Sequence, residues 1–192
     1  MIAIIKYNAG NIRSVQNALI RIGQRSIVTD DLSILEKASK IILPGVGEAS
    51  TAIQYLKDRK LDRFILDTKK PFLGICLGLQ LMCQHSEESD TTCLGIFDTM
   101  VKKFSNKAKV PHMGWNNFEK LDSPLFEKVD SLDDVYYVHS YYADICHYTI
   151  ATCDYITPFS SALQKDNYYA TQFHPEKSAS VGEQILKNFI KL

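Results

Sequence analysis

The first 75 residues alternate between short apolar runs and segments with helical spacing, and this alternation limits the possible folds more than any other feature. Apolar runs at residues 2–7, 25–29, 40–43 and 72–75 predict buried strands. Residues 11–22 carry apolar side chains three or four positions apart, residues 48–58 have a similar character, and another helix is expected directly after Cys76. Strands that alternate with helices in this way predict an α/β fold with a mainly parallel central sheet flanked by helices.

The second half of the chain has a different pattern. From about residue 95 onwards, β-like segments rich in aromatic and β-branched residues occur at 110–118, 135–142, 149–153 and 168–173. Residues 181–190 then have the spacing of a closing helix. We therefore expect added β-rich segments in this half. Because no repeat, low-complexity tract or linker interrupts the chain, residues 1–192 are expected to form one domain.

Charge and cysteine content argue against several classes of protein. Twenty-two basic residues balance twenty-two acidic ones, so neither nucleic-acid binding nor a polybasic membrane patch is expected. The apolar run before Lys6 is too short for a signal peptide or a membrane span. The five cysteines, at positions 76, 83, 93, 146 and 153, lack C-x-x-C spacing. We expect a cytoplasmic, reduced protein without a metal or cofactor.

One cysteine lies where a predicted strand becomes a predicted helix, within GICLGLQ (residues 74–80). The spacing Gly-x-Cys-x-Gly copies the strand–turn–helix pattern of a nucleophile elbow, with sulfur in place of a hydroxyl. The N-terminus of a helix favours negative charge and lowers the pKa of a thiol, and the flanking glycines leave room for a substrate. Cys76 is therefore a candidate nucleophile. The alternative is a small buried residue in a glycine-flanked turn.

The segment QFHPEKS (residues 172–178) contains a candidate base for this nucleophile. His174 precedes a proline, which favours extended backbone. Side chains two residues apart on an extended segment face the same side, so Glu176 can reach the ring of His174. A base with an orienting carboxylate is the arrangement that activates a nucleophile. Alone, such a segment is more often a surface turn, but its combination with Cys76 favours catalysis.

Residues 44–47, Pro-Gly-Val-Gly, follow another predicted strand. Active sites of parallel sheets form beyond the carboxyl ends of the strands, so this loop and Cys76 are expected to be neighbours. The glycines on either side of Val46 allow peptide planes to rotate at little steric cost. A plain tight turn is the alternative.

These motifs give the chain a clear resemblance to class-I (triad-type) glutamine amidotransferases, whose two signature blocks are similar to GICLGLQ and HPEKS. More narrowly, it resembles the glutaminase subunits of imidazole glycerol phosphate synthases, through YNAGN (7–11), PGVG (44–47), VPHMGWN (110–116) and HSYY (139–142). Together the blocks extend from residue 7 to residue 178. The resemblance implies a flavodoxin-like sheet and an enzyme of histidine biosynthesis that hydrolyses glutamine and passes ammonia to a cyclase, which makes imidazole glycerol phosphate and AICAR.

The resemblance also implies a role for individual residues. Cys76 would be the nucleophile, His174 the acid–base group and Glu176 the orienting carboxylate. The oxyanion hole would be formed by Leu77 together with Gly45, Val46 and Gly47. Glutamine would be bound by Gln80, Glu88, Ser140 and Tyr141, with the backbone of the last two holding its carboxylate. Glu87, beside Glu88 in an acidic cluster, remains an alternative.

A heterodimer with a (β/α)₈-barrel cyclase subunit is a further implication of the resemblance. The candidate contacts with that partner are Asn11, Trp115, Tyr136 and Lys177. His112 and Asn116 would lie nearby, although a histidine in an aromatic strand is more often structural. Since losing one oxyanion donor costs roughly 10² to 10³ in rate, a peptide flip at Gly45 or Val46 would act as a switch. The chain alone is therefore expected to be a poor glutaminase that its partner activates.

Three other interpretations compete with this one. A paralogous glutaminase subunit that feeds ammonia to a surface-carbohydrate amidotransferase would have the same triad and differ only in its partner. A stand-alone cysteine hydrolase on a similar sheet is disfavoured by Gln80 and by the late His-Pro-Glu segment. A non-enzymatic binding module is disfavoured because Cys76, His174 and Glu176 are all present.

Overall fold

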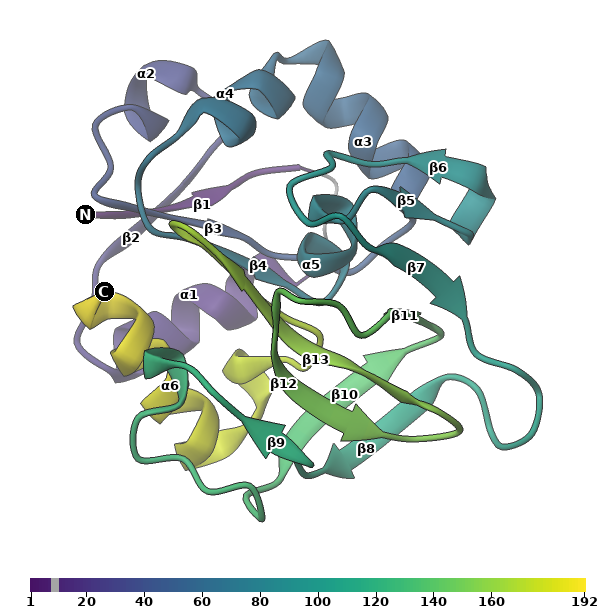
Figure 1. The fold of residues 1–192 in the computed structure, drawn as a ribbon. Helices are drawn as coiled ribbons and strands as arrows, with labels where there is room; N and C mark the ends of the chain where they lie inside the picture. Colours follow the sequence, from purple (N-terminus) through teal and green to yellow (C-terminus); the bar gives the residue numbers. More distant parts are fainter. Residues whose placement is uncertain (8–10) are drawn as a thin grey trace.

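The computed structural model describes residues 1–7 and 11–192. Residues 8–10, the middle of the YNAGN block, lie outside the described residues, so only Tyr7 and Asn11 of that block can be placed. Figure 1 shows a twisted central sheet with helices on both faces. The expected α/β architecture, with helices on both faces of a central sheet, is thus confirmed.

The central sheet has eight strands. In spatial order they are β2 (Ser26–Thr29), β1 (Ile2–Ile5), β3 (Lys40–Leu43), β4 (Phe72–Ile75), β14 (Tyr168–Thr171), β13 (Pro158–Lys165), β12 (Thr149–Asp154) and β9 (Lys120–Leu121). The strands from β2 to β14 are parallel, and the pairs from β14 to β9 are antiparallel. The parallel strands therefore end at one common edge, where the candidate motifs lie.

Alternate strand residues face two separate apolar clusters. Ile4 and Leu73 join the cluster packed by α1 (Ile12–Arg21) and α6 (Ala179–Lys191). Ile5 and Phe72 join the opposite cluster, which contains residues of α2 (Leu32–Leu35), α3 (Ala49–Asp58), α4 (Leu61–Asp67) and α5 (Leu77–Met82). Because both faces of these strands are covered, their sequences are apolar throughout rather than alternating.

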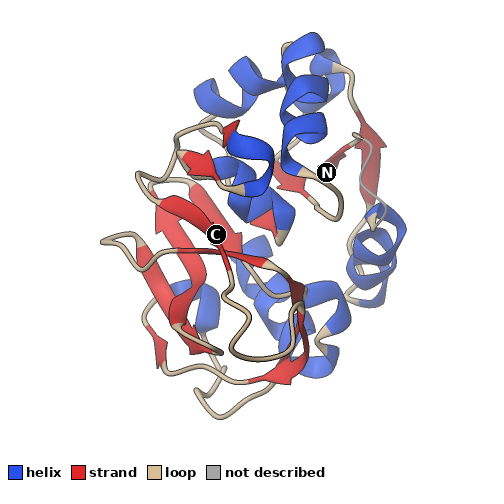
Figure 2. Cartoon of the chain, turned by 90° about the vertical axis from the view of Figure 1, so that its right-hand side faces the viewer, coloured by secondary structure: helices blue, strands red, loops and turns tan. Residues whose placement is uncertain are grey.

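Two smaller sheets, formed by strands between residues 85 and 143, accompany the central sheet; Figure 2 shows all the strands in red and the helices in blue. One pairs β8 (His112–Asn116) with β10 (Val135–His139). The other contains β11 (Tyr141–Ala143), β7 (Met100–Lys103), β5 (His85–Ser86) and β6 (Thr91–Thr92). Short 3₁₀ turns occur at η1 (Glu88–Asp90), η2 (Pro124–Phe126) and η3 (Pro175–Lys177).

Some elements differ from the sequence-based expectation. The segment expected as one strand at 135–142 is two strands in different sheets, separated at Ser140. Strand β13 was not predicted, because its fully buried Ser160 and Ser161 interrupt the apolar signal. Ser160 Oγ donates to the carbonyl of Asp144 at 2.8 Å, so the hydroxyl is paired inside the protein.

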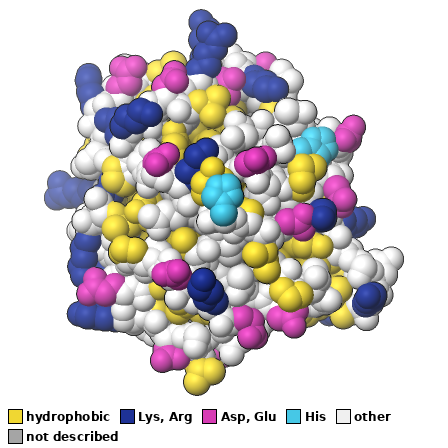
Figure 3. Space-filling view, viewed as in Figure 1, with side chains coloured by type: hydrophobic (Ala, Val, Ile, Leu, Met, Phe, Trp, Pro, Cys, Tyr) yellow, Lys and Arg dark blue, Asp and Glu magenta, His cyan; other side chains and the backbone are white. Residues whose placement is uncertain are grey.

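Charged side chains of both signs are interspersed on the face drawn in Figure 3, as the balanced composition leads one to expect. Within the described part of the chain, no helix has the length and apolar character needed to cross a membrane.

Candidate active site

Cys76 lies at the sharp turn between β4 and α5. Its φ and ψ are +53° and −105°, outside the range of ordinary strand or helix residues, and its amide donates to the carbonyl of Thr171 at 2.7 Å. The flanking glycines are required by packing. A Cβ at Gly78 would lie 2.2 Å from the carbonyl oxygen of Leu43, and one at Gly74 would lie 2.6 Å from the sulfur of Met82. The glycines therefore let α5 begin directly against the sheet. This packing role is additional to the room for a substrate that the sequence suggested.

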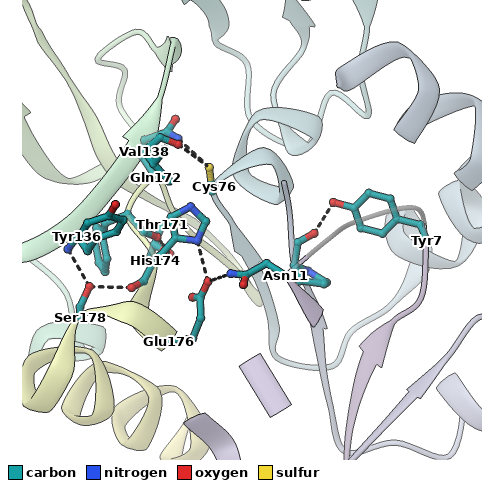
Figure 4. A network of polar contacts seen from close by, with 12 residues as sticks. Tyr7, Asn11, Cys76, Tyr136, Val138, Thr171, Gln172, His174, Glu176 and Ser178 are labelled. Carbon is teal, nitrogen blue, oxygen red and sulfur yellow. Dashed lines mark hydrogen bonds and ion pairs between the residues drawn. The ribbon is translucent and has the colours of Figure 1, made fainter. Parts of the chain in front are cut away.

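His174 and Glu176 form a buried pair next to this turn. His174 Nδ1 lies 2.7 Å from Glu176 Oε1, and both side chains are fully buried. In Figure 4 the ring of His174 lies between the sulfur of Cys76 and the carboxylate of Glu176. The expected reason for this contact was only partly right. His174 is extended, but the chain turns into η3 at Pro175, and this turn brings Glu176 back onto the ring.

Asn11 completes the group, because its side-chain amide donates to the same carboxylate oxygen of Glu176. Sequence reasoning placed Asn11 among the partner contacts, whereas its side chain is buried beside Glu176. The two residues are 165 positions apart, so no local pattern could have indicated the contact.

The ionisation of His174 is set by its neighbours. Burial lowers the pKa of the imidazole, but the charge and closeness of the Cys76 sulfur, the hydrogen bond that Nδ1 donates to Glu176 and the charge of Glu176 outweigh that effect and raise the pKa to about 10. When the thiol of Cys76 is ionised, His174 is therefore favoured as the imidazolium, with a proton on both ring nitrogens. Within residues 1–7 and 11–192, His174 Nε2 has no hydrogen-bond partner. The sulfur of Cys76 instead contacts the carbonyl of Val138 at 3.8 Å, so the nucleophile and base are adjacent but not yet bonded.

A cavity of about 310 Å³ opens onto the sulfur of Cys76, a volume at the small end of ligand sites. Most of the residues that the sequence analysis assigned to the site line this cavity. The lining residues are Val46, Gly47, Cys76, Leu77, Gln80, Glu88, Pro111, Val138, His139, Ser140 and Tyr141. His174 lies behind this lining rather than in it.

The acidic cluster at the cavity contributes one carboxylate to its wall. Glu88 lines the cavity, and its Oε2 accepts from the amide of Ala49 at 2.8 Å. Burial raises the pKa of Glu88, an effect that the Ala49 amide opposes. Glu87 is exposed and accepts from the amide of Lys103 at 2.7 Å. Of the two glutamates left open by the sequence, Glu88 is the one that can contact a molecule in the cavity.

Gln80 and Tyr141 are joined across the cavity. Gln80 Nε2 donates to the carbonyl of Tyr141 at 2.9 Å, and Ser140, next to Tyr141, accepts from the amide of Phe104 at 3.0 Å through its carbonyl. The Tyr141 carbonyl also lies 2.8 Å from Nδ1 of His139. This wall of the cavity is therefore held in place on several sides.

His139 belongs to a buried histidine pair that sequence reasoning did not identify. His139 Nε2 lies 3.0 Å from Nδ1 of His112, and the His112 ring stacks on Tyr155 at 4.0 Å between ring centroids. Burial lowers the pKa of His112 to about 4 and that of His139 to about 3, so both are neutral near pH 7. His112 thus serves as packing behind the cavity wall.

The predicted oxyanion segment has its carbonyl, rather than an amide, facing Leu77. The Leu77 amide donates to the carbonyl oxygen of Gly45 at 3.4 Å. A Cβ at Gly45 would lie 2.6 Å from both the amide nitrogen of Gly78 and the Cβ of Leu77. Gly45 is therefore fixed by close contact with α5, and Tyr7 holds the preceding peptide because its hydroxyl donates to the Pro44 carbonyl.

Three of the four predicted partner contacts lie together at the surface. Trp115 is 53% exposed, and its ring meets that of Tyr136 edge-on at 5.9 Å. Lys177 Nζ lies 5.7 Å from the centre of the Tyr136 ring. The carbonyl of Tyr136 accepts from the amide of His174 at 2.9 Å, so this exposed group borders directly on the buried pair.

The chain is similar to several known proteins. The family model described as glutamine amidotransferase class-I matches residues 3–192. A Bacteroides fragilis protein named imidazole glycerol phosphate synthase subunit HisH is 56% identical over 100% of this chain and 99% of the relative. A protein of the same name from Bacteroides thetaiotaomicron is 54% identical with the same coverage. A solved glutamine amidotransferase structure has the same fold, with a TM-score of 0.76 at 14% identity over 100% of this chain and 98% of that one.

Proposed function

Because the chain belongs to the class-I glutamine amidotransferase family and, within it, to the HisH subunits of imidazole glycerol phosphate synthase, we propose that residues 1–192 act as one glutaminase domain in histidine biosynthesis. The domain hydrolyses L-glutamine to glutamate and ammonia, and passes the ammonia to a (β/α)₈-barrel cyclase subunit. That subunit makes imidazole glycerol phosphate and AICAR. We place the enzyme in the cytoplasm, since all five cysteines are free thiols.

The observation that carries this proposal is the buried His174–Glu176 pair beside Cys76, at the base of a cavity of about 310 Å³. A nucleophile on a strained turn, a base behind it and a carboxylate on the far side of the base are the parts of a cysteine triad. Glu176 orients the imidazole through Nδ1, which leaves Nε2 for proton transfer.

The reaction proceeds in two halves. The thiol proton of Cys76 moves to Nε2 of His174, and the sulfur attacks the side-chain carbonyl carbon of glutamine. His174 then returns the proton to the departing nitrogen, so that ammonia leaves and a γ-glutamyl thioester remains. In the second half His174 takes a proton from water, the resulting hydroxide attacks the thioester, and glutamate leaves as the thiol re-forms. Each proton taken by His174 is thus given back within the cycle.

Groups around the cavity match the polar ends of glutamine. Glu88 presents a carboxylate, which suits the α-ammonium group. Gln80 and the backbone at Ser140 and Tyr141 line the remaining wall and would hold the amide and the α-carboxylate. The reacting carbon is thereby directed to Cys76.

The oxyanion hole requires a rearrangement before reaction. The Leu77 amide is one candidate donor, but it is bonded to the Gly45 carbonyl. Rotation of the Gly45–Val46 peptide would withdraw that oxygen and present the Val46 amide in its place. We propose that the cyclase, bound at Trp115, Tyr136 and Lys177, drives this rotation. The buried contact of Asn11 with Glu176 would then lie beneath the interface rather than in it.

The test is steady-state glutamine hydrolysis by the isolated chain, then with the histidine-pathway cyclase, then with the cyclase and its nucleotide substrate. The expected result is a low rate that rises with the cyclase and rises further with the nucleotide. Stimulation only by a carbohydrate-pathway ligase would favour the paralogue. A full rate without any partner would favour a stand-alone hydrolase.

A further inference from the structure

Gln172 lies between β14 and the His174–Glu176 pair, and the proposed mechanism gives it no role. It is fully buried, and its amide donates to the carbonyl of Ser161 at 2.8 Å. Its side chain points toward the sulfur of Cys76, as Figure 4 shows, with Nε2 at 3.6 Å from Sγ. The residue therefore touches the reacting atom without lining the cavity.

The orientation of this side-chain amide is determined by a chain of contacts. The carbonyl of Tyr141 can only accept, so the Gln80 atom 2.9 Å from it is the donor Nε2. The same Nε2 also lies 3.1 Å from the side chain of Gln172, which must present its acceptor Oε1 there. The other end of the Gln172 amide is consequently the NH₂ group, and this group faces the sulfur. No alternative orientation satisfies all three contacts.

The sulfur of Cys76 thus has two hydrogen-bonding neighbours of opposite kind. The Val138 carbonyl accepts and stabilises the protonated thiol, whereas the Gln172 amide donates and stabilises the thiolate. When the thiol proton moves to His174, the bond to Val138 is lost and the bond from Gln172 becomes charge-assisted and stronger. We propose that Gln172 is a further catalytic residue, which holds the ionised sulfur of Cys76 in place for attack.

The same contacts connect the glutamine cavity to the nucleophile. Gln80 lines the cavity and also donates to Gln172, which donates to Cys76. A ligand that fixes Gln80 therefore also fixes the donor on the sulfur. The effect of Gln172 is expected mainly in the chemical step, because its own side chain does not face the cavity.

The experiment measures alkylation of Cys76 by iodoacetamide against pH in the full-length chain, followed by peptide mass so that the other four cysteines do not interfere. Gln172→Met keeps the length of the side chain and removes the donor. Gln172→Asn keeps an amide that is too short to reach both partners. Gln164→Met is the matched control, since Gln164 makes two side-chain contacts, with Ser123 and Tyr169, away from the site.

Removal of the donor is expected to raise the pH midpoint of alkylation by about one unit, which means about tenfold slower alkylation at pH 7. Gln172→Asn should shift the midpoint in the same direction, and Gln164→Met should not. The other titratable groups near the sulfur are His174 and Tyr7, and neither residue is substituted in any of the three variants. In glutamine hydrolysis by the complex with the cyclase, kcat should fall by a similar factor and KM should change much less.

A folded Gln172→Met or Gln172→Asn chain with the alkylation profile of wild type would overturn the proposal, even if its activity were lower. A change in KM with kcat preserved would also overturn it, since that pattern indicates an indirect effect through Gln80. The kinetic part rests on the proposed function, but the alkylation does not. Failure of the proposed function would appear separately, as a wild-type complex that does not hydrolyse glutamine.

Discussion

Gly47 provides a direct test of the resting oxyanion segment. Its φ is +142°, a value that residues with a side chain rarely adopt, and the residue is exposed. The loop is held on both sides, by the bond from Tyr7 to Pro44 and by Glu48, whose carboxylate caps α3 at the amides of Ser50 and Thr51. A rotation of the Gly45–Val46 peptide must therefore be compensated within residues 45–47, and Gly47 is the residue best able to absorb it.

Replacing Gly47 by alanine adds strain to the resting conformation. A residue held in such a region costs about 1–3 kcal/mol, which corresponds to about a 5- to 150-fold change in an equilibrium. Because Gly47 is the residue expected to compensate a rotation of the Gly45–Val46 peptide, we expect that rotation to release the added strain. We therefore expect the glutaminase rate of the isolated Gly47→Ala chain to rise by a factor in that range. The rise is limited by the factor of roughly 10² to 10³ that one oxyanion donor contributes.

The assay is glutamine hydrolysis with and without the cyclase and its nucleotide substrate, with Gly23→Ala as the control. Gly23 has a φ of +76° and no atom within 4 Å of an added Cβ, so its variant carries backbone strain away from the site. Both variants should lose stability, but only Gly47→Ala should gain basal activity and show less stimulation. A Gly47→Ala chain with the basal rate of wild type would refute the reasoning. Gly45 is unsuitable for this test, because any side chain there collides with α5.

Three further predictions follow from the site and its surroundings. Cys76→Ala should abolish glutamine hydrolysis with little change in unfolding temperature, and an electrophilic glutamine analogue should modify Cys76 alone, as read by peptide mass; labelling of another cysteine would contradict the assignment. His174→Ala should lower kcat/KM by roughly 10² to 10⁴, and Glu176→Ala should lower it less, a ranking that parallel kinetics at pH 7 would check. Glu48 has a pKa lowered to about 2, chiefly by the Thr51 amide, so its stabilising effect is complete above its ordinary pKa of 4.5 and is lost as the pH falls toward 2. Urea denaturation should show that Glu48→Ala costs about 1 kcal/mol at pH 7 and progressively less in acid.

The parts of the fold that could be predicted are those whose cause is local. Buried parallel strands are apolar throughout, so β1, β3 and β4 stand out in the sequence. The turn at Cys76 was also predictable, because two glycines at fixed spacing mark a strand that passes directly into a helix. Strand β13 was missed for the opposite reason: its buried serines are stabilised by partners elsewhere in the chain, among them Tyr137, whose hydroxyl lies 2.6 Å from Ser161 Oγ.

The features of the site that could not be predicted from the sequence depend on contacts between distant segments or on the orientation of a peptide plane. The triad residues were proposed from two short motifs, but Asn11 reaches Glu176 across 165 positions. The motif that contains Gln172 does not indicate a role for it, because the proposed role depends on Gln80 and Tyr141, which lie on two other elements. The orientation of the Gly45 carbonyl is likewise invisible in a sequence, since either direction of a peptide plane fits the same residues.

The resting state of the site depends mainly on two backbone carbonyls. The Gly45 carbonyl accepts the hydrogen bond of the Leu77 amide, and the Val138 carbonyl accepts that of the Cys76 thiol. The sulfur makes no hydrogen bond to His174 in the described part of the chain. The thiol loses its contact with Val138 when its proton moves to His174, whereas the Leu77 amide is released only if the Gly45–Val46 peptide rotates. On the proposed mechanism, activation therefore requires movement of backbone as well as of the catalytic side chains. Val138 lies on β10, two residues after Tyr136, whose side chain is half-buried and whose ring meets that of Trp115 edge-on. A partner that contacts this pair therefore acts on the same strand that holds the thiol in its unreactive form.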